Sequence, residues 1–390
     1  MKEIKNKLKP KRWRKVKLGE LGKIITGKTP STFDPSNFGG PYPFITIPDL
    51  KDQRYVEKVE RTISEKGAKL MKNLKLSPRA VVVSCLATVG EVGITIKESF
   101  TNQQINAVIC NENEVTPEFL YYYFKYSKPR LLKYSGSVYT NISKSKFADF
   151  EIFYPEDIND QKRIADILSA FDDKIELNNK INQNLEQTAQ AIFKEWFVKF
   201  KFPDHKKAKF VDSELGKIPK GWEVKNLGDI LVLEYGEALT SINRKKGVIP
   251  VYGSSGLVGY HDKKLVNGPG IIIGRAGIPG SVYWSQVDFH CVDSTFYVET
   301  KISKYFVFYL LKRQNLKSLI SGSAVPGINR NIIYPNRIVL PLPSIINDFE
   351  KIMSPIFLKI YKNKLENQKL ASLRDLLLPK LMSGKILVKS

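Results

Sequence analysis

The sequence predicts a mixed α/β (α+β) fold in which two globular domains are joined by two long antiparallel helices. Three observations support this architecture. Two stretches have the apolar spacing of long amphipathic helices, a series of landmarks recurs at a constant shift, and the intervening segments are short, strand-like and punctuated by glycine. The chain is therefore expected to be one α/β globule followed by one long helix, present twice with a pseudo-twofold relation.

The two long helices are predicted within residues 158–200 and 346–390, where apolar residues recur every three or four positions. Polar residues interrupt each apolar seam at matching places, namely Asn178 and Asn182 in the first helix and Asn363 and Asn367 in the second. A buried asparagine in such a seam fixes register and partner. We therefore expect these asparagines to set the register of an antiparallel coiled coil. One unrelated core helix in each domain is the alternative.

The second helix carries two local predictions. Its apolar seam is expected to include Phe349, Ile352 and Leu373. Asn347 and Glu350 have the spacing of a capping box. The helix is therefore expected to begin near Asn347.

The internal repeat rests on landmarks that follow one another in the same order in both halves of the chain. Trp13 recurs as Trp222, and each copy has a helix with a candidate N-cap, Thr116 or Ser303, before its long helix. The predicted organisation is a first globule at 1–157, a first long helix at 158–200, a basic linker at 201–221, a second globule at 222–345 and a second long helix at 346–390.

Composition and charge indicate a protein that binds nucleic acid. The 390 residues are 42% hydrophobic, and 62 lysines and arginines outweigh 39 acidic residues to give a net charge of +23. The basic N-terminal segment has no apolar run after it, so no signal peptide is predicted, and no stretch is apolar and long enough to span a bilayer. Three widely separated cysteines form no disulfide framework. A cytoplasmic location fits these features.

One motif imitates a nucleotide-binding loop. The segment Gly22–Thr29 satisfies the pattern GxxxxGK[ST]. A phosphate-binding loop needs a helix directly after it, and the following PSTFDPSNFGGPYP cannot start one. We therefore interpret Lys28 as part of a turn near DNA phosphate.

A catalytic role has little support in the sequence. Asp288, Glu299 and Lys301 have a loose nuclease-like spacing, so a single-chain DNA nuclease is the alternative function. The three histidines lack the spacing of a zinc site, and no adenine-methylation motif or glycine-rich cofactor loop is present. We expect no cofactor and no metal in this chain. A coiled-coil adaptor that binds only protein is a further alternative, which the positive charge disfavours.

Polar and basic loops at corresponding places in the two globules are the candidate DNA contacts. Arginine and lysine recognise guanine edges, whereas serine, threonine and backbone amides mostly hold phosphate. Each residue alone could belong to a solvated loop, but the matched set predicts DNA binding. The candidates are Lys28, Thr29, Ser31, Lys51, Arg54, Ser135, Ser137, Tyr139, Asn141, Lys144, Lys146, Arg244, Lys245, Lys246, Tyr252, Ser254, Ser255, Arg275, Ser323, Asn329 and Arg330.

The long helices would hold two such globules at a fixed spacing. A helix over 164–197 spans roughly 50 Å at 1.5 Å per residue. At the rise of B-DNA this length corresponds to at most about 15 base pairs. Two DNA-binding globules at such a spacing predict a split recognition site.

The chain resembles the specificity subunits of Type I restriction–modification systems. The resemblance is carried by the segments 214–219, 249–260 and 274–282, by Gly221-Trp222 and by the Ser-Gly-Ser turns. It covers nearly the whole chain. The first copy departs from the pattern, because Pro10-Lys11-Arg12-Trp13 stands where the second has a GxIPxGW entry.

The resemblance implies that the globules are target recognition domains, each recognising one half of an asymmetric, gapped site on double-stranded DNA. The helices would be conserved spacer regions that dock two methyltransferase subunits, and restriction subunits would join the assembly. S-adenosylmethionine, ATP and magnesium would be bound by those partners and not by this chain. The chain itself would be non-catalytic and would not bind a membrane.

Overall fold

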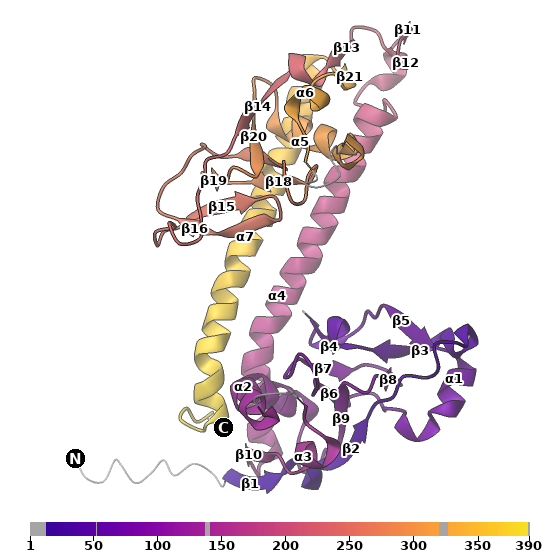
Figure 1. The fold of residues 1–390 in the computed structure, drawn as a ribbon, viewed down its shortest axis with the longest axis vertical. Helices are drawn as coiled ribbons and strands as arrows, with labels where there is room; N and C mark the ends of the chain where they lie inside the picture. Colours follow the sequence, from indigo (N-terminus) through magenta and orange to yellow (C-terminus); the bar gives the residue numbers. More distant parts are fainter. Residues whose placement is uncertain (1–12, 52, 137–140, 320–326, 389–390) are drawn as a thin grey trace, which may run out of the picture. The chain divides into compact units, whose positions relative to one another are not determined.

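The computed structural model describes residues 13–51, 53–136, 141–319 and 327–388. The chain divides into two compact units. Unit 1 comprises residues 1–175 and 368–390, and unit 2 comprises residues 176–367. Each unit therefore contains one α/β globule and a part of each long helix (Figure 1).

Unit 1 is built on a five-stranded sheet with the order β2-β9-β6-β7-β4. Its strands are β2 (Gly22–Thr26), β9 (Ile105–Cys110), β6 (Val81–Ser84), β7 (Val92–Thr95) and β4 (Tyr55–Val56). A three-stranded sheet has the order β5-β3-β8, with β5 (Arg61–Ile63), β3 (Phe38–Ile45) and β8 (Phe100–Thr101). Strands β1 (Trp13–Lys17) and β10 (Glu151–Pro155) form an antiparallel pair. The near-continuous apolar strands, such as β6, are buried on both faces.

The first globule also contains the short helices α1 (Glu65–Leu70) and α3 (Lys144–Ala148) and the longer helix α2 (Pro117–Ser135). Helix α2 begins as predicted, because the Thr116 side chain accepts a hydrogen bond from the Phe119 amide and Pro117 occupies the first turn. One face of the helix, which includes Phe119 and Tyr122, is fully buried in the core of unit 1.

Unit 2 has the same plan. Its four-stranded sheet has the order β14-β20-β17-β18, with β14 (Leu231–Tyr235), β20 (Thr295–Thr300), β17 (Gly270–Gly274) and β18 (Val282–Ser285). A three-stranded sheet has the order β16-β15-β19, with β16 (Gly256–His261), β15 (Ile249–Gly253) and β19 (His290–Cys291). Strands β13 (Glu223–Asn226) and β21 (Arg337–Leu340) form the entry pair, and the helices are α5 (Lys304–Arg313) and α6 (Arg330–Ile333). Ser303 precedes α5, but its side chain makes no capping hydrogen bond.

The segment interpreted as a linker is folded. It contains the antiparallel hairpin of β11 (Phe210–Ser213) and β12 (Gly216–Pro219). Gly216 has a φ of +92°, a conformation that glycine adopts without steric cost. Phe202, at the start of this segment, packs on Trp222 with 5.2 Å between ring centroids.

The long helices are α4 (Ile158–Phe193), which continues into a π-helical turn over Lys194–Val198, and α7 (Pro343–Met382). Helix α7 begins earlier than predicted, because Pro343 can occupy the first turn, where no amide donor is required. Asn347 therefore lies inside the helix, and the predicted capping box is wrong. The predicted seam is also wrong at Ile352 and Leu373, which are exposed. Met353 is buried in place of its neighbour Ile352.

The asparagines of the helix seams pair with one another within unit 2. Asn178 Nδ2 donates to Asn367 Oδ1 at 2.8 Å, and Asn363 Nδ2 donates to Asn182 Oδ1 at 2.8 Å. A step of four residues forward on α4 matches a step of four residues backward on α7, so the two segments run antiparallel. Asn178 and Asn363 are each 1% exposed, so their amides are satisfied by the partner helix and not by water.

The end of each long helix lies close to the tryptophan at the start of a globule. In unit 2, Phe197 lies 6.1 Å from Trp222 between ring centroids. In unit 1, Gly384 follows α7 and has a φ of +68°, and a Cβ added there would lie 3.1 Å from the Trp13 ring. The residues after α4 and α7 thus occupy similar places in the two units.

Removing one member of an asparagine pair should destabilise unit 2. In the Asn363→Leu variant the buried Asn182 amide loses its partner, and we expect the free energy of unfolding to fall by about 1–3 kcal/mol. The double variant Asn182→Leu/Asn363→Leu should recover most of this loss, because no buried polar group is left without a partner. Urea titrations followed by circular dichroism would measure both. The exposed Asn184→Ala variant is the control, and equal losses in the single and double variants would contradict the pairing.

Candidate nucleic-acid interface

In unit 1, several of the candidate residues lie on loops at one end of the five-stranded sheet. Strand β2 ends there and β9 begins there, because the two strands are antiparallel. The amide of Gly27 donates to Ile105 O at 3.1 Å, and the amide of Lys28 donates to Thr101 O at 3.0 Å. Thr29 Oγ1 lies 2.8 Å from Gln103 Oε1. These bonds fix the backbone of the loop while the Lys28 side chain remains exposed.

The loop before α3 reaches the same end of the sheet. Ile142 N donates to Cys85 O at 2.8 Å, and Asn106 Nδ2 donates to Ile142 O at 3.1 Å. The side chain of Ser143 caps α3 by accepting a hydrogen bond from the Lys146 amide. The exposed side chains of Asn141, Lys144 and Lys146 are thereby placed near the turn that carries Lys28.

Unit 2 places its loops on an equivalent set of backbone hydrogen bonds. Gly236 N donates to Thr295 O at 3.1 Å, as Gly27 N does to Ile105 O in unit 1. Ile328 N donates to Arg275 O at 2.9 Å, as Ile142 N does to Cys85 O. Arg275, Asn329 and Arg330 therefore lie at the corresponding end of the four-stranded sheet.

The hairpin of β15 and β16 contributes further candidates in unit 2. The turn residue Ser254 is tied to this sheet end, because its carbonyl accepts hydrogen bonds from Ser281 Oγ at 2.9 Å and Tyr283 OH at 3.1 Å. Ser255 is exposed beside it. Arg244 donates to the Val258 carbonyl of β16 at 2.6 Å, and the neighbouring Lys245 and Lys246 are exposed in the segment that precedes β15.

Not every candidate is at these sheet ends. Arg54 is 6% exposed and forms an ion pair with Asp173, so it lies in the interior of unit 1 and not on a surface loop. Ser135 is also buried, and its hydroxyl donates to Leu132 O at 2.8 Å. Tyr252 is half-buried and donates to Trp284 O at 3.4 Å. Two further candidates, Lys51 and Ser31, are exposed. Ser137, Tyr139 and Ser323 lie outside the described residues.

Sequence reasoning missed the polar network that surrounds Arg54. Tyr122 OH, which accepts from Arg54 at 3.3 Å, donates to Asp172 Oδ2 at 2.7 Å. Asp172 also pairs with Arg374 of α7. The pKa of Tyr122 is raised, and burial is the largest cause. The hydroxyl therefore stays protonated and remains a donor. This network ties the first globule to both long helices within unit 1.

A nucleotide-binding loop is not formed at Gly22–Thr29. Its first residues form β2, and a short 3₁₀ turn (Pro35–Asn37), not an α-helix, is the next helical element. The required helix N-terminus is therefore missing from this stretch.

The geometry does not favour a metal-dependent nuclease. No group of three or more histidine, cysteine, aspartate or glutamate side chains is placed to hold a metal ion among the described residues. Asp288 instead pairs with Lys264 at 2.7 Å, and this hydrogen bond lowers the pKa of its carboxyl. Burial raises the pKa of the Cys85 thiol to about 11 and that of Cys291 to about 12, so neither is a thiolate at neutral pH.

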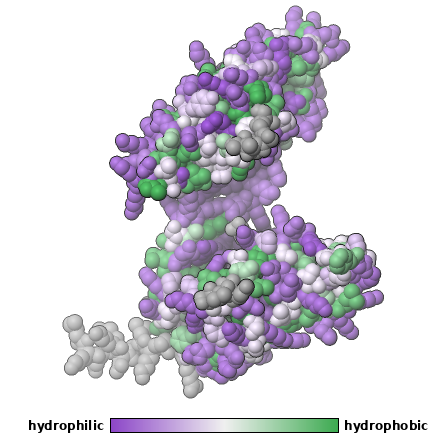
Figure 2. All heavy atoms as spheres, viewed as in Figure 1, coloured by the Kyte–Doolittle hydropathy of each residue, from purple (hydrophilic) through white to green (hydrophobic). Residues whose placement is uncertain are grey.

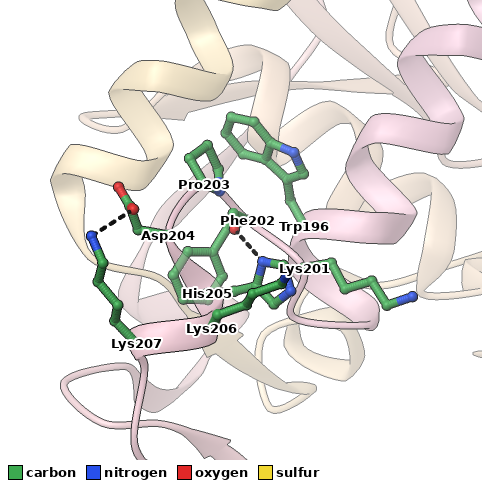
Figure 3. A pocket seen from close by; sticks show the side chains of 8 residues that line it. All are labelled: Trp196, Lys201, Phe202, Pro203, Asp204, His205, Lys206 and Lys207. Carbon is green, nitrogen blue, oxygen red and sulfur yellow. Dashed lines mark hydrogen bonds and ion pairs between the residues drawn. The ribbon is translucent and has the colours of Figure 1, made fainter.

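A hollow of about 530 Å³ lies in unit 2 where α4 ends (Figure 3). Trp196, Phe202 and Pro203 supply its apolar walls, and the remaining lining residues are Lys201, Asp204, His205, Lys206 and Lys207. His205 Nδ1 lies 2.9 Å from Phe202 O, and Lys207 pairs with Asp204 at 3.1 Å. Sequence reasoning did not anticipate this hollow, because it is created by the folding of the segment between α4 and Trp222.

The surface is dominated by hydrophilic residues. Figure 2 shows them over most of the visible face of each unit, with small apolar patches between them. Within the described ranges, no helix is both long enough and apolar enough to cross a membrane.

The architecture defines a class of protein in which two α/β units, each with a polar, basic loop cluster at one sheet end, are built on long helices. The family model for the Type I restriction modification DNA specificity domain matches residues 10–187 and 219–375. The chain belongs to this family. Proteins of the family are specificity subunits and not catalytic subunits, so the nuclease alternative is not favoured.

Individual relatives agree with this assignment. The Type I restriction enzyme MjaIX specificity subunit of Methanocaldococcus jannaschii is 32% identical over 97% of this chain and 95% of its own length. The HindI specificity subunit of Haemophilus influenzae is 38% identical over 37% of this chain and 32% of its own length. The crystal structure of a Type-I restriction-modification system S subunit from M. genitalium has a TM-score of 0.61 at 18% identity, covering 96% of this chain and 97% of that chain, which shows a shared fold.

Replacing Lys28 should weaken DNA binding without changing the preferred sequence. The exposed ammonium group is expected to contact phosphate, so Lys28→Ala should lower the salt dependence of binding by about one unit of slope. Fluorescence anisotropy between low and moderate salt would measure this. Lys15→Ala is the control, since Lys15 is exposed but pairs with Glu151 on β10. An altered sequence preference for Lys28→Ala would mean that this lysine contacts bases.

Proposed function

We propose that this chain is the sequence-recognition subunit of a Type I restriction–modification complex and that its two globules recognise the two halves of a bipartite, gapped site on double-stranded DNA. One observation carries the proposal. The order β14-β20-β17-β18 in unit 2 corresponds to β2-β9-β6-β7 in the five-stranded sheet of unit 1, and corresponding hydrogen bonds fix the loops at one sheet end, yet the two units expose different side chains there. A shared framework with different exposed residues suits two domains that recognise different base sequences.

The proposed domains are target recognition domains at 1–157 and 222–345, conserved spacer helices at 158–200 and 346–390, and a connecting segment at 201–221. The matching sheets support a pseudo-twofold relation between the two copies. The antiparallel asparagine contacts of α4 and α7 support pairing of the spacer helices as a coiled coil whose register is set by those asparagines.

The spacer helices are the proposed docking surface for two methyltransferase subunits, with restriction subunits joining the same complex. Exposed leucines on both helices support this, since Leu177, Leu358, Leu365 and Leu376 are 51%, 41%, 38% and 57% exposed. Leu358 and Leu365 are seven residues apart and so lie on the same side of α7. Neighbouring exposed apolar residues of this kind are typical of partner surfaces. S-adenosylmethionine, ATP and magnesium belong to the partners in this proposal, and we infer a cytoplasmic location from the DNA substrate and the absence of a disulfide framework in the sequence.

A map of adenine methylation in the source cells, with and without this chain, tests the proposal. We expect one bipartite motif with a fixed gap to lose methylation when the chain is absent, because the methyltransferase would no longer be directed to that sequence. The cells must contain a partner methyltransferase that is active at other sites. If the methylation map of such cells does not change when this chain is removed, the proposed function is refuted.

The spacer helices should set the gap in that motif. Deleting residues 177–183 together with the facing residues 362–368 removes about two turns, roughly 10 Å, from each helix. Both members of each asparagine pair are lost together, and the Asp172–Arg374 pair remains to hold the register. The expected result is the same half-sites with a gap shorter by about three base pairs. Deleting 177–183 alone is the control, because it leaves the facing asparagines of α7 without partners and should abolish directed methylation. A double deletion that altered the half-sites would contradict the spacer role.

A further inference from the structure

Two arginines pack against the ring of an exposed tyrosine at the sheet end of unit 2. Tyr235 is the last residue of β14 and is 46% exposed. Its ring packs on Phe296 with 5.0 Å between centroids. The guanidinium carbons of Arg275 and Arg330 lie 5.5 Å and 5.1 Å from the centroid of the Tyr235 ring, within the range of cation–π attraction. These three residues come from three separate segments of the chain.

Both guanidinium groups are held in place by backbone carbonyls. Arg275 Nε donates to Asp293 O at 3.1 Å, and Arg330 NH1 donates to Leu233 O at 3.3 Å. The bond of Arg275 is exposed and that of Arg330 is partly buried. Because the hydrogen bond to Asp293 O uses Nε, the two terminal nitrogens of Arg275 can serve as donors to a ligand.

The charge of this pair is not cancelled by acidic side chains. Other arginines, such as Arg79 and Arg374, form ion pairs with carboxylates. Among the described residues, no carboxylate forms an ion pair with Arg275 or Arg330. Two fixed positive groups without acidic partners favour a ligand that offers acceptor atoms, and the aromatic ring favours a flat one.

At the corresponding positions that the structure describes in unit 1, the side chains are different. The matching loop hydrogen bonds put Thr26 where unit 2 has Tyr235, and Cys85 where it has Arg275. Thr26 Oγ1 donates to Asn106 Oδ1 at 2.6 Å. The aromatic and arginine cluster therefore belongs to one unit and not to the shared framework.

Resting on the proposed function, we propose that Arg275 recognises a guanine in the half-site of unit 2 and that Tyr235 and Arg330 position it. Guanine presents O6 and N7 as two acceptors in the major groove, and the terminal nitrogens of an arginine match them. Preorganisation by the ring and by the Asp293 carbonyl lowers the entropy lost on binding. A phosphate could also accept from this guanidinium, and the experiment separates these ligands.

The experiment maps adenine methylation in cells that carry the whole complex with single variants of this chain. Arg275→Lys keeps the charge but loses the paired donors. We expect it to reduce discrimination at one G·C position of one half-site by about 5- to 150-fold, leaving the other half-site unchanged. Binding of the full chain to duplexes with that base pair replaced, measured by anisotropy, should give the same loss of discrimination.

Two tyrosine variants test the positioning role. Tyr235→Phe keeps the ring and should retain the wild-type motif, whereas Tyr235→Ala should relax the same base position as Arg275→Lys. Arg313→Ala is the matched control, since Arg313 is exposed at the end of α5. Thermal melting of each variant checks that the fold is intact.

The outcomes are distinct. Equal weakening at all sequences would assign Arg275 to phosphate and overturn the proposal, as would a relaxed position in the half-site of unit 1 or one that is not G·C. The absence of any bipartite motif that depends on the wild-type chain would instead refute the proposed function, and this inference with it.

Discussion

The antiparallel contact between α4 and α7 is the interaction on which the rest of the structure depends. In unit 2 it is made by asparagine pairs with amide hydrogen bonds, and in unit 1 by Asp172 of α4 with Arg374 of α7. Apolar residues supply most of the burial along each helix, but they tolerate sliding. Directional polar contacts penalise a shifted register, because a buried amide or charge would be left without a partner. Specificity of pairing is therefore obtained from a few polar residues.

The sequence predicted much of the fold, and the errors have physical causes. Long helices produce a strong periodic signal, so α4 and the end of α7 were located well. When two apolar residues are adjacent in the sequence, their spacing does not show which of the two is buried. Ile352 was expected in the core, but its neighbour Met353 is buried instead. The polar positions were recognised from the interrupted seams, but their pairing, Asn178 with Asn367 and Asn182 with Asn363, depends on register that neither helix reveals alone.

The candidate site was predicted less completely. Loops that carry Lys28, Lys144, Arg275 and Arg330 were identified because the two copies align, and the structure gathers them at one sheet end in each unit. Arg54 was predicted to contact DNA because of its residue type, but it is buried. Its charge is balanced by Asp173 in a polar network that no local sequence pattern indicates. Tyr235 was missed because its importance arises only when three distant segments meet around its ring. Long-range convergence leaves no signal in the spacing of residues.

The packing of the helix ends has a consequence for how the polypeptide is connected. Gly384 lies against Trp13 in unit 1 much as Phe197 and Phe202 lie against Trp222 in unit 2. The contacts that seat a helix end on an opening tryptophan are thus made once across a covalent connection and once without one. Such packing therefore does not require that the helix end and the tryptophan be close in the chain, because Phe197 and Trp222 are separated by a short segment whereas Trp13 and Gly384 are far apart in sequence.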